Sequence, residues 1–148
     1  MDIKIRQANK NDIPILIKLH IKLLDFEGVR EINEENINWA FQKIINSENS
    51  YIFLIEHAGN IAGMCSLHTL ISSIEGGFCG LIEDFYIDEK YRKLGLGQAL
   101  VENIEEFCKV KDYKRIQLLC RSNNANAIKF YEKLDFNGTD MVFFYKRL

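Results

Sequence analysis

Hydrophobic positions recur along this chain with two different periods, and the two alternate. Residues 3–6 alternate polar and apolar side chains, as a half-buried strand does. Further alternating or short apolar runs predict strands over 51–56, 61–70, 81–87, 115–120 and 141–146. Spacings of three and four residues predict helices after Asn11 or Asp12, around 37–45, around 100–108 and over 124–133. This order predicts an α+β fold on a mixed sheet whose strands between 51 and 87 form an antiparallel meander.

Nothing in the 148 residues divides the chain. It contains no internal repeat, no low-complexity segment and no Gly/Ser/Pro linker, so residues 1–148 are expected to form a single domain. With 47% hydrophobic residues but no apolar stretch of membrane-spanning length, no membrane role is expected. The N-terminus lacks the apolar core of a signal peptide, and we therefore expect a cytoplasmic protein.

Charge and side-chain chemistry exclude several classes of function. The net charge of −2 is spread along the chain without a Lys/Arg cluster, so no nucleic-acid partner is expected. The cysteines form no C-x-x-C pair, and we predict no metal site and reduced, mostly buried thiols at Cys65, Cys79, Cys108 and Cys120. The histidines are interpreted as structural: His20, His57 and His68.

One glycine-containing turn carries specific chemistry. Residues 92–97 read Arg-Lys-Leu-Gly-Leu-Gly between a predicted strand and a predicted helix. A helix begins with unpaired N–H groups and a partial positive charge, and Gly95 and Gly97 allow a ligand to approach the backbone. The turn predicts a phosphate site, with an ordinary tight turn as the alternative. A Rossmann motif would need glycine at Leu100, and a Walker A motif would need Gly-Lys-Ser/Thr, so neither fits.

A second motif identifies the kind of phosphate ligand. Residues 124–131 read Asn-Ala-Asn-Ala-Ile-Lys-Phe-Tyr. Together with the glycine turn, they resemble the R/Q-x-x-G-x-G/A and N-x-x-A-x-x-x-Y motifs of the GCN5-related N-acetyltransferase (GNAT) superfamily, and the order of elements is similar from Ile3 onward. The resemblance implies a central mixed, mostly antiparallel sheet of six to seven strands flanked by about four helices. The family usually has glycine where this chain has Asp135, a residue that tolerates the same left-handed conformation comparatively well.

The resemblance also implies a co-substrate and its contacts. Acetyl-CoA would be the acetyl donor, and no metal would be needed. The backbone of the strand before the turn would pair with the pantetheine arm through Phe85, Tyr86 and Ile87. Backbone N–H groups would hold the pyrophosphate over Arg92, Lys93, Leu94, Gly95, Leu96, Gly97 and Gln98. Asn124 would bond the pantetheine, and Tyr131 would lie close to the sulfur.

Acetyl transfer to an amine needs a base, because an alkylamine of pKa near 10.4 is protonated at pH 7. Glu83 is the first candidate and Asp84 the second, and each has a surface charge as the alternative interpretation. Strand alternation would place the two on opposite faces unless a bulge intervenes. Tyr131 could protonate the leaving thiolate, or it could be a core aromatic.

The acceptor is less well defined by the sequence. The segment 81–87 is similar to the same strand of small-amine acetyltransferases, and an acidic stretch from Asp25 to Glu35 would suit a cationic acceptor if it lines the site. We therefore expect an N-acetyltransferase acting on a primary amine of a small molecule. The alternatives are a protein or peptide N-acetyltransferase and a non-catalytic acyl-CoA-binding module. A homodimer formed through an exposed final strand, Met141 to Lys146, is also expected.

Overall fold

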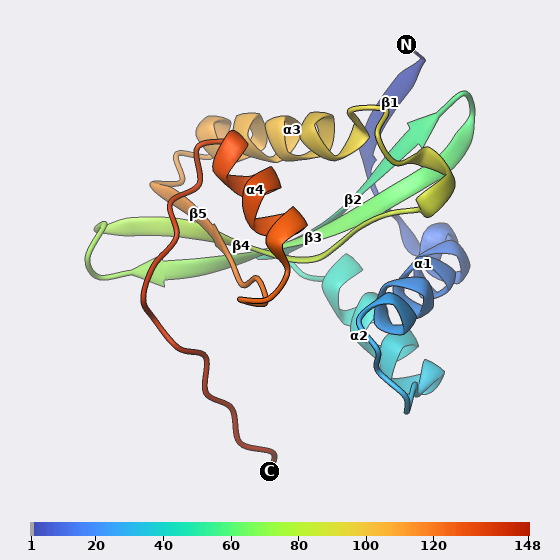
Figure 1. Cartoon of the computed structure of the whole chain (residues 1–148), viewed down its shortest axis with the longest axis horizontal. Helices are drawn as coiled ribbons and strands as arrows, with labels where there is room; N and C mark the ends of the chain where they lie inside the picture. The colour runs from blue at the N-terminus through green and yellow to red at the C-terminus, as the bar shows by residue number, and fades with distance from the viewer. Residues whose placement is uncertain (1) are drawn as a thin grey trace. The chain divides into compact units, whose positions relative to one another are not determined.

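A computed structural model describes residues 2–148, which divide into two compact units, one up to Leu118 and one from Leu119 onward. The first unit is built on one five-stranded sheet of order β1-β2-β3-β4-β5 (Figure 1). Its strands are β1 (Ile3–Gln7), β2 (Ser50–His57), β3 (Asn60–Ser72), β4 (Gly77–Ile87) and β5 (Arg115–Leu118). The first four strands pair antiparallel and β5 joins β4 in parallel, so the predicted mixed sheet and meander are confirmed.

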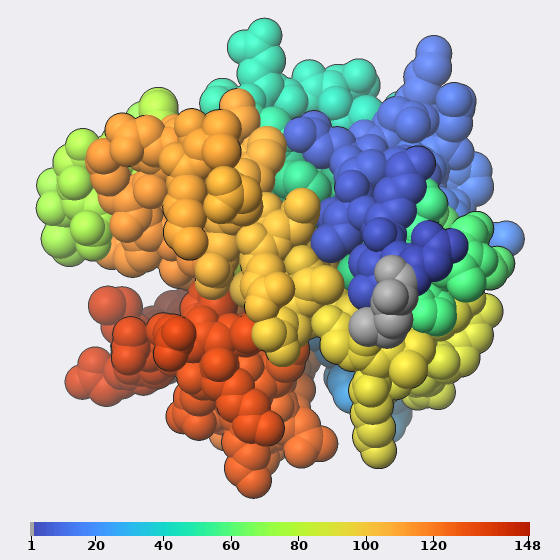
Figure 2. All heavy atoms as spheres, turned by 90° about the horizontal axis from the view of Figure 1, so that it is seen from above, coloured from blue at the N-terminus to red at the C-terminus, as the bar shows by residue number. Residues whose placement is uncertain are grey.

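Helices cover both faces of this sheet. The helices α1 (Ile13–Phe26) and α2 (Glu34–Ile45) lie on one face, and α3 (Leu96–Val110) lies on the other (Figure 1). The first face has a core made of residues from both helices and the sheet, including Leu16, Leu19, Phe41, Met64 and Tyr86. Because β2 and β3 each carry a continuous buried run and successive side chains point to opposite faces, each strand also supplies side chains to the other face. There α3 contacts β1, β2 and β4 and is visible from above in Figure 2.

The first helix starts where predicted, with Asp12 as its N-cap residue, but without the predicted side-chain cap. The sequence predicts a cap at Asn11 or Asp12, but Asn9 makes the capping box and Asp12 closes it, around the short 3-10 helix η1 (Lys10–Asp12). Asp12 makes no side-chain cap to α1 and instead binds Arg6 at 2.8 Å. The hydrogen bonds from Arg6 lower the pKa of Asp12 below its ordinary value. A strand-to-helix ion pair therefore replaces the predicted cap.

The second unit contains α4 (Ala125–Lys133), with Asn124 as its N-cap. The helix ends as predicted, because Asp135 adopts φ = 63° and the Phe136 N–H returns to the Tyr131 carbonyl. The predicted final strand over 141–146 is wrong: these residues form no helix or strand, and Met141 and Phe144 are 84% and 87% exposed. An apolar run forms a strand only when its backbone N–H and C=O groups make hydrogen bonds with a neighbouring strand. The described chain thus has five strands instead of six to seven, with the four predicted helices.

The thiols follow the prediction. Cys65, Cys79 and Cys108 are free and buried, and Cys120 is free and exposed. Burial raises the pKa of Cys108 to about 11, which keeps it protonated and unreactive at neutral pH. Across residues 2–148, none of the helices has the length and apolar character needed to span a membrane. That residues 1–148 form one domain stays a prediction.

Candidate active site

A bulge in β4 organises the predicted catalytic strand. Ser66 of β3 pairs with Glu83, while Met64 pairs with Tyr86, so β4 holds one residue more than β3 across this interval. Asp84 absorbs the extra residue with φ = 51°, a left-handed conformation that is uncommon outside glycine. Strand alternation is interrupted here, and the simple expectation of opposite faces does not hold. Through their contacts, both Glu83 and Asp84 belong to the face that carries α1 and α2.

Asp84 is fixed by neighbours from two other elements. The Ser66 hydroxyl of β3 donates a hydrogen bond of 2.9 Å to Oδ2 of Asp84. Nδ1 of His20, in α1, lies 3.6 Å from Oδ1 of the same carboxylate. The Asp84 side chain is 26% exposed, so it is partly covered yet still reachable. A left-handed backbone at a non-glycine residue costs on the order of 1–3 kcal/mol, and such strain clusters at functional sites.

Glu83 has looser surroundings. Its carboxylate lies 3.5 Å from Nε2 of His68, and its side chain is 48% exposed. His68 in turn bonds the Ser50 hydroxyl through Nδ1 at 2.9 Å. Each carboxylate therefore has one histidine and one serine in its neighbourhood. Ser66 contacts Asp84 directly, whereas Ser50 contacts His68 and not Glu83 itself.

The sheet opens directly beside these carboxylates. The ladder between β4 and β5 runs from Cys79 to Ile82, so Glu83 is the first β4 residue beyond it. The Asp88 N–H donates to the Ala62 carbonyl on β3, and strand alternation then directs the Tyr86 N–H toward β3 as well. The N–H groups of Phe85 and Ile87 consequently point away from β3, toward the edge of β4 that pairs with β5 over Cys79 to Ile82. This edge is the part of the strand for which pairing with pantetheine is predicted.

Gly63 sets the strand spacing at the same place. It pairs with Ile87, and a Cβ at this position would lie 2.5 Å from the Tyr86 carbonyl oxygen and 2.5 Å from the Ile87 side chain. Any larger residue would push β4 away from β3. Gly63 therefore supports the geometry of the predicted donor strand.

The glycine turn begins α3 as predicted. Lys93 and Gly95 adopt left-handed φ values of 61° and 78°, and Gly95 is the N-cap residue. The helix has no side-chain cap and no acidic residue in its first turn. The first helical bond runs from the Ala99 N–H to the Gly95 carbonyl, which leaves the N–H groups of 96–98 ahead of it. These features fit an anion, so the residues present suit a pyrophosphate.

Arg92 has a different place from the residues that follow it. Its backbone N–H donates to the Glu89 carbonyl, and its Nε donates to the Ile87 carbonyl at 3.1 Å. The guanidinium lies 4.9 Å from the ring centroid of Phe26 and 5.7 Å from that of Tyr86. Arg92 thus ties the turn to the end of β4 and to α1.

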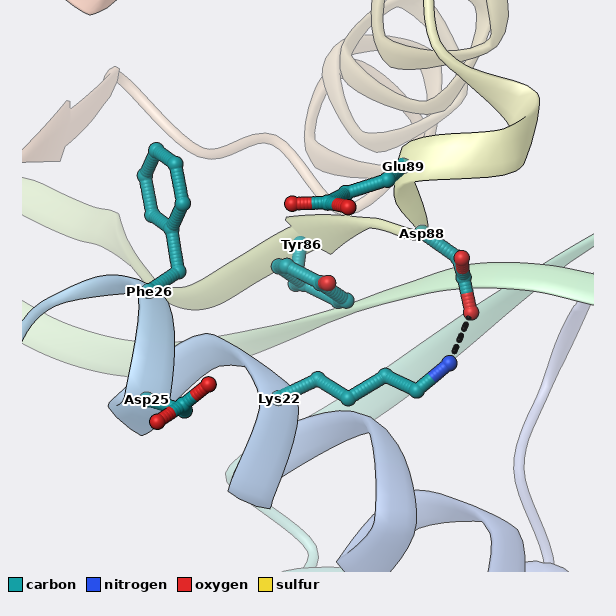
Figure 3. A pocket seen from close by; sticks show the side chains of 6 residues that line it. All are labelled: Lys22, Asp25, Phe26, Tyr86, Asp88 and Glu89. Carbon is teal, nitrogen blue, oxygen red and sulfur yellow. Dashed lines mark hydrogen bonds and ion pairs between the residues drawn. The ribbon is translucent and has the colours of Figure 1, made fainter.

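A cavity of about 190 Å³ lies between the end of α1 and the end of β4. Figure 3 shows Lys22, Asp25 and Phe26 reaching it from α1, opposite Tyr86, Asp88 and Glu89. Lys22 pairs with Asp88 at 2.5 Å, and Glu89 lies 4.0 Å from Nη1 of Arg92, so Asp25 supplies the remaining carboxylate of the lining. The two aromatic walls, Phe26 and Tyr86, face the Arg92 guanidinium. Of the acidic stretch from Asp25 to Glu35, Asp25 lines it, whereas Glu34 and Glu35 occupy the first turn of α2.

Burial and pairing shift the ionisation of this lining. Burial is the largest single effect on Asp88 and tends to raise its pKa, but the hydrogen bonds from Lys22 and from the Lys90 N–H, together with the positive charges of both lysines, outweigh burial and lower the net pKa. The hydrogen bond to Asp88 raises the pKa of Lys22, and burial raises the pKa of Tyr86. At neutral pH the Lys22–Asp88 pair is ionised and the Tyr86 hydroxyl is neutral.

In the second unit, the motif residues lie on α4. The Asn124 Oδ1 accepts the Ala127 N–H at 3.1 Å, so the motif asparagine also has a capping role. The ring of Tyr131 contacts those of Phe130 and Phe136. The roles of Asn124 toward pantetheine and of Tyr131 toward sulfur stay predictions.

Sequence reasoning missed three residues of the site. His20 and Ser66 both adjoin Asp84, and Gly63 spaces the strands. Ser66 and Gly63 carry no sequence signal of their own, because their importance depends on strand register. His20 was interpreted as structural, and only the packing of α1 brings it to β4. Within residues 2–148, no group of three or more His, Cys, Asp or Glu residues could hold a metal ion.

Comparison with known proteins agrees with this geometry. The sequence model described as the acetyltransferase (GNAT) family matches residues 19–136. An uncharacterized N-acetyltransferase of Methanocaldococcus jannaschii is 25% identical over 140 residues, 93% of this chain, and the chain spans 62% of that relative's length. A Bacillus subtilis protein, named as a proposed ribosomal protein bS18-alanine N-acetyltransferase, is 26% identical over 77% of this chain and 76% of its own.

Solved structures share the fold. A possible acetyltransferase from Clostridium difficile has a TM-score of 0.88 at 19% identity, with 99% of this chain and 97% of its own covered. A predicted acetyltransferase from Clostridium acetobutylicum, solved with acetyl-CoA, has a TM-score of 0.81 at 17% identity, with 97% and 96% covered. A metagenomic aminoglycoside acetyltransferase in complex with sisomicin has a TM-score of 0.81 at 21% identity, with 99% and 96% covered.

Proposed function

The chain belongs to the acetyltransferase (GNAT) family, and from that premise we propose that it transfers the acetyl group of acetyl-CoA to a primary amine of a small molecule. The amine attacks the thioester directly, without a covalent acetyl-enzyme. The observation that carries the proposal is the β4 bulge. It sets two carboxylates where the β4–β5 ladder ends, on the strand that leads to the anion-receptive start of α3.

Binding of the donor is supported by backbone groups. The pyrophosphate would accept hydrogen bonds from the N–H groups of 93–98, and Gly95 provides the left-handed turn that directs them. The pantetheine amides would pair with the edge of β4 that faces away from β3, through Phe85 and Ile87, as an added strand does. Acetyl-CoA supplies the activated acyl group when it is bound.

Asp84 is the base in this proposal. Deprotonating an amine at pH 7 costs roughly 4–5 kcal/mol, so a fixed acceptor beside the amine raises the rate. Two contacts support Asp84 over Glu83 in this role: the Ser66 hydroxyl holds one oxygen, and His20 faces the other. The proton leaves the ammonium nitrogen and binds Asp84. Glu83, which is half exposed, attracts the cationic acceptor to the site.

Two further charges develop during the reaction, one on the acetyl oxygen and one on the leaving sulfur, and a backbone N–H and a tyrosine hydroxyl would stabilise them. The oxyanion that develops on the acetyl carbonyl would accept a hydrogen bond from an N–H on the edge of β4 that faces away from β3. The Tyr131 hydroxyl would then protonate the leaving thiolate, consistent with its place in the family motif. Replacement of Tyr131 by Phe is expected to lower kcat with little change in acetyl-CoA affinity.

The acceptor is proposed to be a small cation. The cavity between α1 and β4 holds the Asp25 carboxylate, which would attract an ammonium group, and the rings of Phe26 and Tyr86, which pack against the Arg92 guanidinium and would contact the apolar body of the acceptor. A protein acceptor is the second candidate, because the Bacillus subtilis relative is named for acetylation of a ribosomal protein.

An assay of released CoA thiol tests both candidates. The panel would contain diamines, polyamines, amino sugars, aminoglycosides and peptides with N-terminal alanine. Turnover with a small cationic amine at a kcat/KM above that of any peptide is the expected result. Turnover confined to peptides would assign the protein acceptor, and silence across the panel with intact CoA binding would favour a binding module.

A variant of the turn separates donor binding from chemistry. Gly97→Val places a β-branched side chain at the start of α3, where the ligand must approach the backbone, so its acetyl-CoA affinity should fall. Calorimetry with CoA measures this directly. Unchanged affinity in a folded Gly97→Val protein would show that the pyrophosphate binds elsewhere.

A further inference from the structure

His20 has an environment that its packing role alone does not explain. The ring lies edge-on to Phe41 of α2, with centroids 5.4 Å apart and planes at 88°. Its Nδ1 is buried and, within residues 2–148, is the one buried side-chain nitrogen or oxygen that has no hydrogen-bond partner. A phenylalanine would satisfy the same packing without burying a polar atom. The presence of a nitrogen at this position therefore calls for a second role.

The nearest charged group gives that role. Oδ1 of Asp84 lies 3.6 Å from Nδ1, slightly beyond hydrogen-bond distance, on the side of the carboxylate that Ser66 does not hold. The His20 side chain is 16% exposed and the Asp84 side chain is 26% exposed, so both are mostly buried and the histidine is the less exposed of the two. A shift of less than about 1 Å would bring the two atoms into a normal hydrogen bond.

We propose that His20 is a positioning residue for Asp84. With a proton on Nδ1, the N–H donates to Oδ1 once the acceptor is bound, while Ser66 donates to Oδ2. The carboxylate is then held by one donor on each oxygen, and each oxygen keeps a lone pair for the amine. When the proton leaves the ammonium nitrogen, the new O–H bond forms on Asp84 and the Nδ1–H bond of His20 stays intact.

This inference rests on the proposed function and adds a residue from α1 to it. The contact joins two segments that are 64 positions apart, since His20 lies in α1 and Asp84 in β4 (20 to 84). It also gives α1 a part in the reaction beyond closing the core. The histidine does not touch the reacting atoms, so its effect must pass through Asp84.

Two substitutions separate positioning from packing. His20→Phe keeps an aromatic ring against Phe41 but removes the nitrogen, whereas His20→Asn keeps an N–H donor near the position of Nδ1 and removes the ring. We expect kcat to fall about tenfold in His20→Phe, the effect of losing one hydrogen bond to a charged group. His20→Asn should recover most of that loss, and KM for acetyl-CoA should stay unchanged in both. The matched control is His57→Phe, because the ring of His57 packs against that of Tyr91.

A double-mutant cycle with Asp84 decides the outcome. In the Asp84→Asn background, His20→Phe should lower kcat by less than twofold, because the group it positions is already gone. An equal tenfold loss in both backgrounds, or a His20→Phe enzyme with wild-type kcat, would overturn the inference while leaving the proposed function intact. A wild-type protein that binds CoA but acetylates no amine would overturn both. Melting temperatures of all variants confirm that folded proteins are compared.

Discussion

Glu83 and Asp84 are consecutive carboxylates on one strand, yet their surroundings differ in kind. Glu83 is 48% exposed and faces a histidine 3.5 Å away. Asp84 is 26% exposed, adopts a left-handed backbone, and is bounded by a serine from β3 and a histidine from α1. A side chain that several elements hold loses little freedom when it reacts, whereas a mobile one must first be ordered. The pair teaches that proximity in sequence does not make two acids equivalent.

The bulge creates this difference. In a regular strand the carboxylates of Glu83 and Asp84 would lie on opposite faces of the sheet, and only one of them could reach the site. The extra residue turns Asp84 back to the face of Glu83 and directs it toward α1. One site can thus hold a fixed acid and an adaptable one.

Of the substitutions that test this difference between the two acids, Asp84→Asn should have the largest effect on kcat. Asparagine tolerates the left-handed backbone and keeps an oxygen for Ser66, so the fold should persist while the base is lost. We expect kcat to fall by about 10²–10⁴-fold, the usual contribution of a general base. Steady-state kinetics with the best amine of the panel measures it. A loss below tenfold would mean that Asp84 is a structural residue of the bulge.

Ser66→Ala should have the next largest effect. It removes the hydroxyl that donates to Oδ2 of Asp84 at 2.9 Å. Loss of a hydrogen bond to a charged group predicts a fall in kcat of about tenfold to a hundredfold. Ser50→Ala is the matched control, because that serine contacts His68 and not a carboxylate. Equal effects of the two substitutions would contradict the distinction between the two acids.

Glu83→Gln should change binding more than chemistry. A half-exposed charge contributes about 0.2–1 kcal/mol, so KM for a cationic amine should rise up to about fivefold with kcat nearly unchanged. Kinetics across amines of one and two positive charges would show a larger KM effect for the dication. If Glu83→Gln instead lowered kcat more than Asp84→Asn, the role of base would belong to Glu83.

Asp88, just beyond the end of β4, is an acid with which Glu83 and Asp84 can be compared. Its substitution should have the smallest effect of the four. Burial tends to raise the pKa of Asp88, and the hydrogen bonds and charges of Lys22 and Lys90 together lower it below the ordinary value. A lowered folded pKa stabilises the protein above the unfolded pKa of about 3.9, and this contribution is lost as pH falls through the folded value. Asp88→Asn should therefore reduce the free energy of unfolding by about 0.2–1 kcal/mol at pH 7 and leave it unchanged near pH 2. Urea titrations at the two pH values test this, and an equal loss at both would assign the effect to packing.

Much of the fold could be predicted from the sequence. Four helices, five strands and the meander followed from hydrophobic periods, because each period reports which side of an element is buried. The predicted strand over 141–146 did not form, and this failure illustrates why strands are harder to predict than helices. A helix satisfies its backbone within one segment, but a strand needs a partner that the local pattern does not specify.

The candidate site divides in the same way. The turn from Arg92 to Gly97 could be found by itself, because glycine and a helix start act locally. Glu83 and Asp84 could be found as candidates, but their ranking required neighbours from elsewhere in the chain. Neither His20 nor Ser66 carries a motif, and their contacts with Asp84 arise from helix packing and strand register.

The sequence by itself determined the class of fold, the anion-receptive turn and the family, since each depends on short-range patterns of apolar residues and glycines. Only the tertiary structure decided that a bulge at Asp84 sets both acids on one face, that Asp84 is the acid contacted by two elements, and that α1 supplies a histidine 3.6 Å from it. The reason is physical. Register, bulges and helix docking are set by the packing of distant segments, and residues gain their chemical environment only when those segments meet.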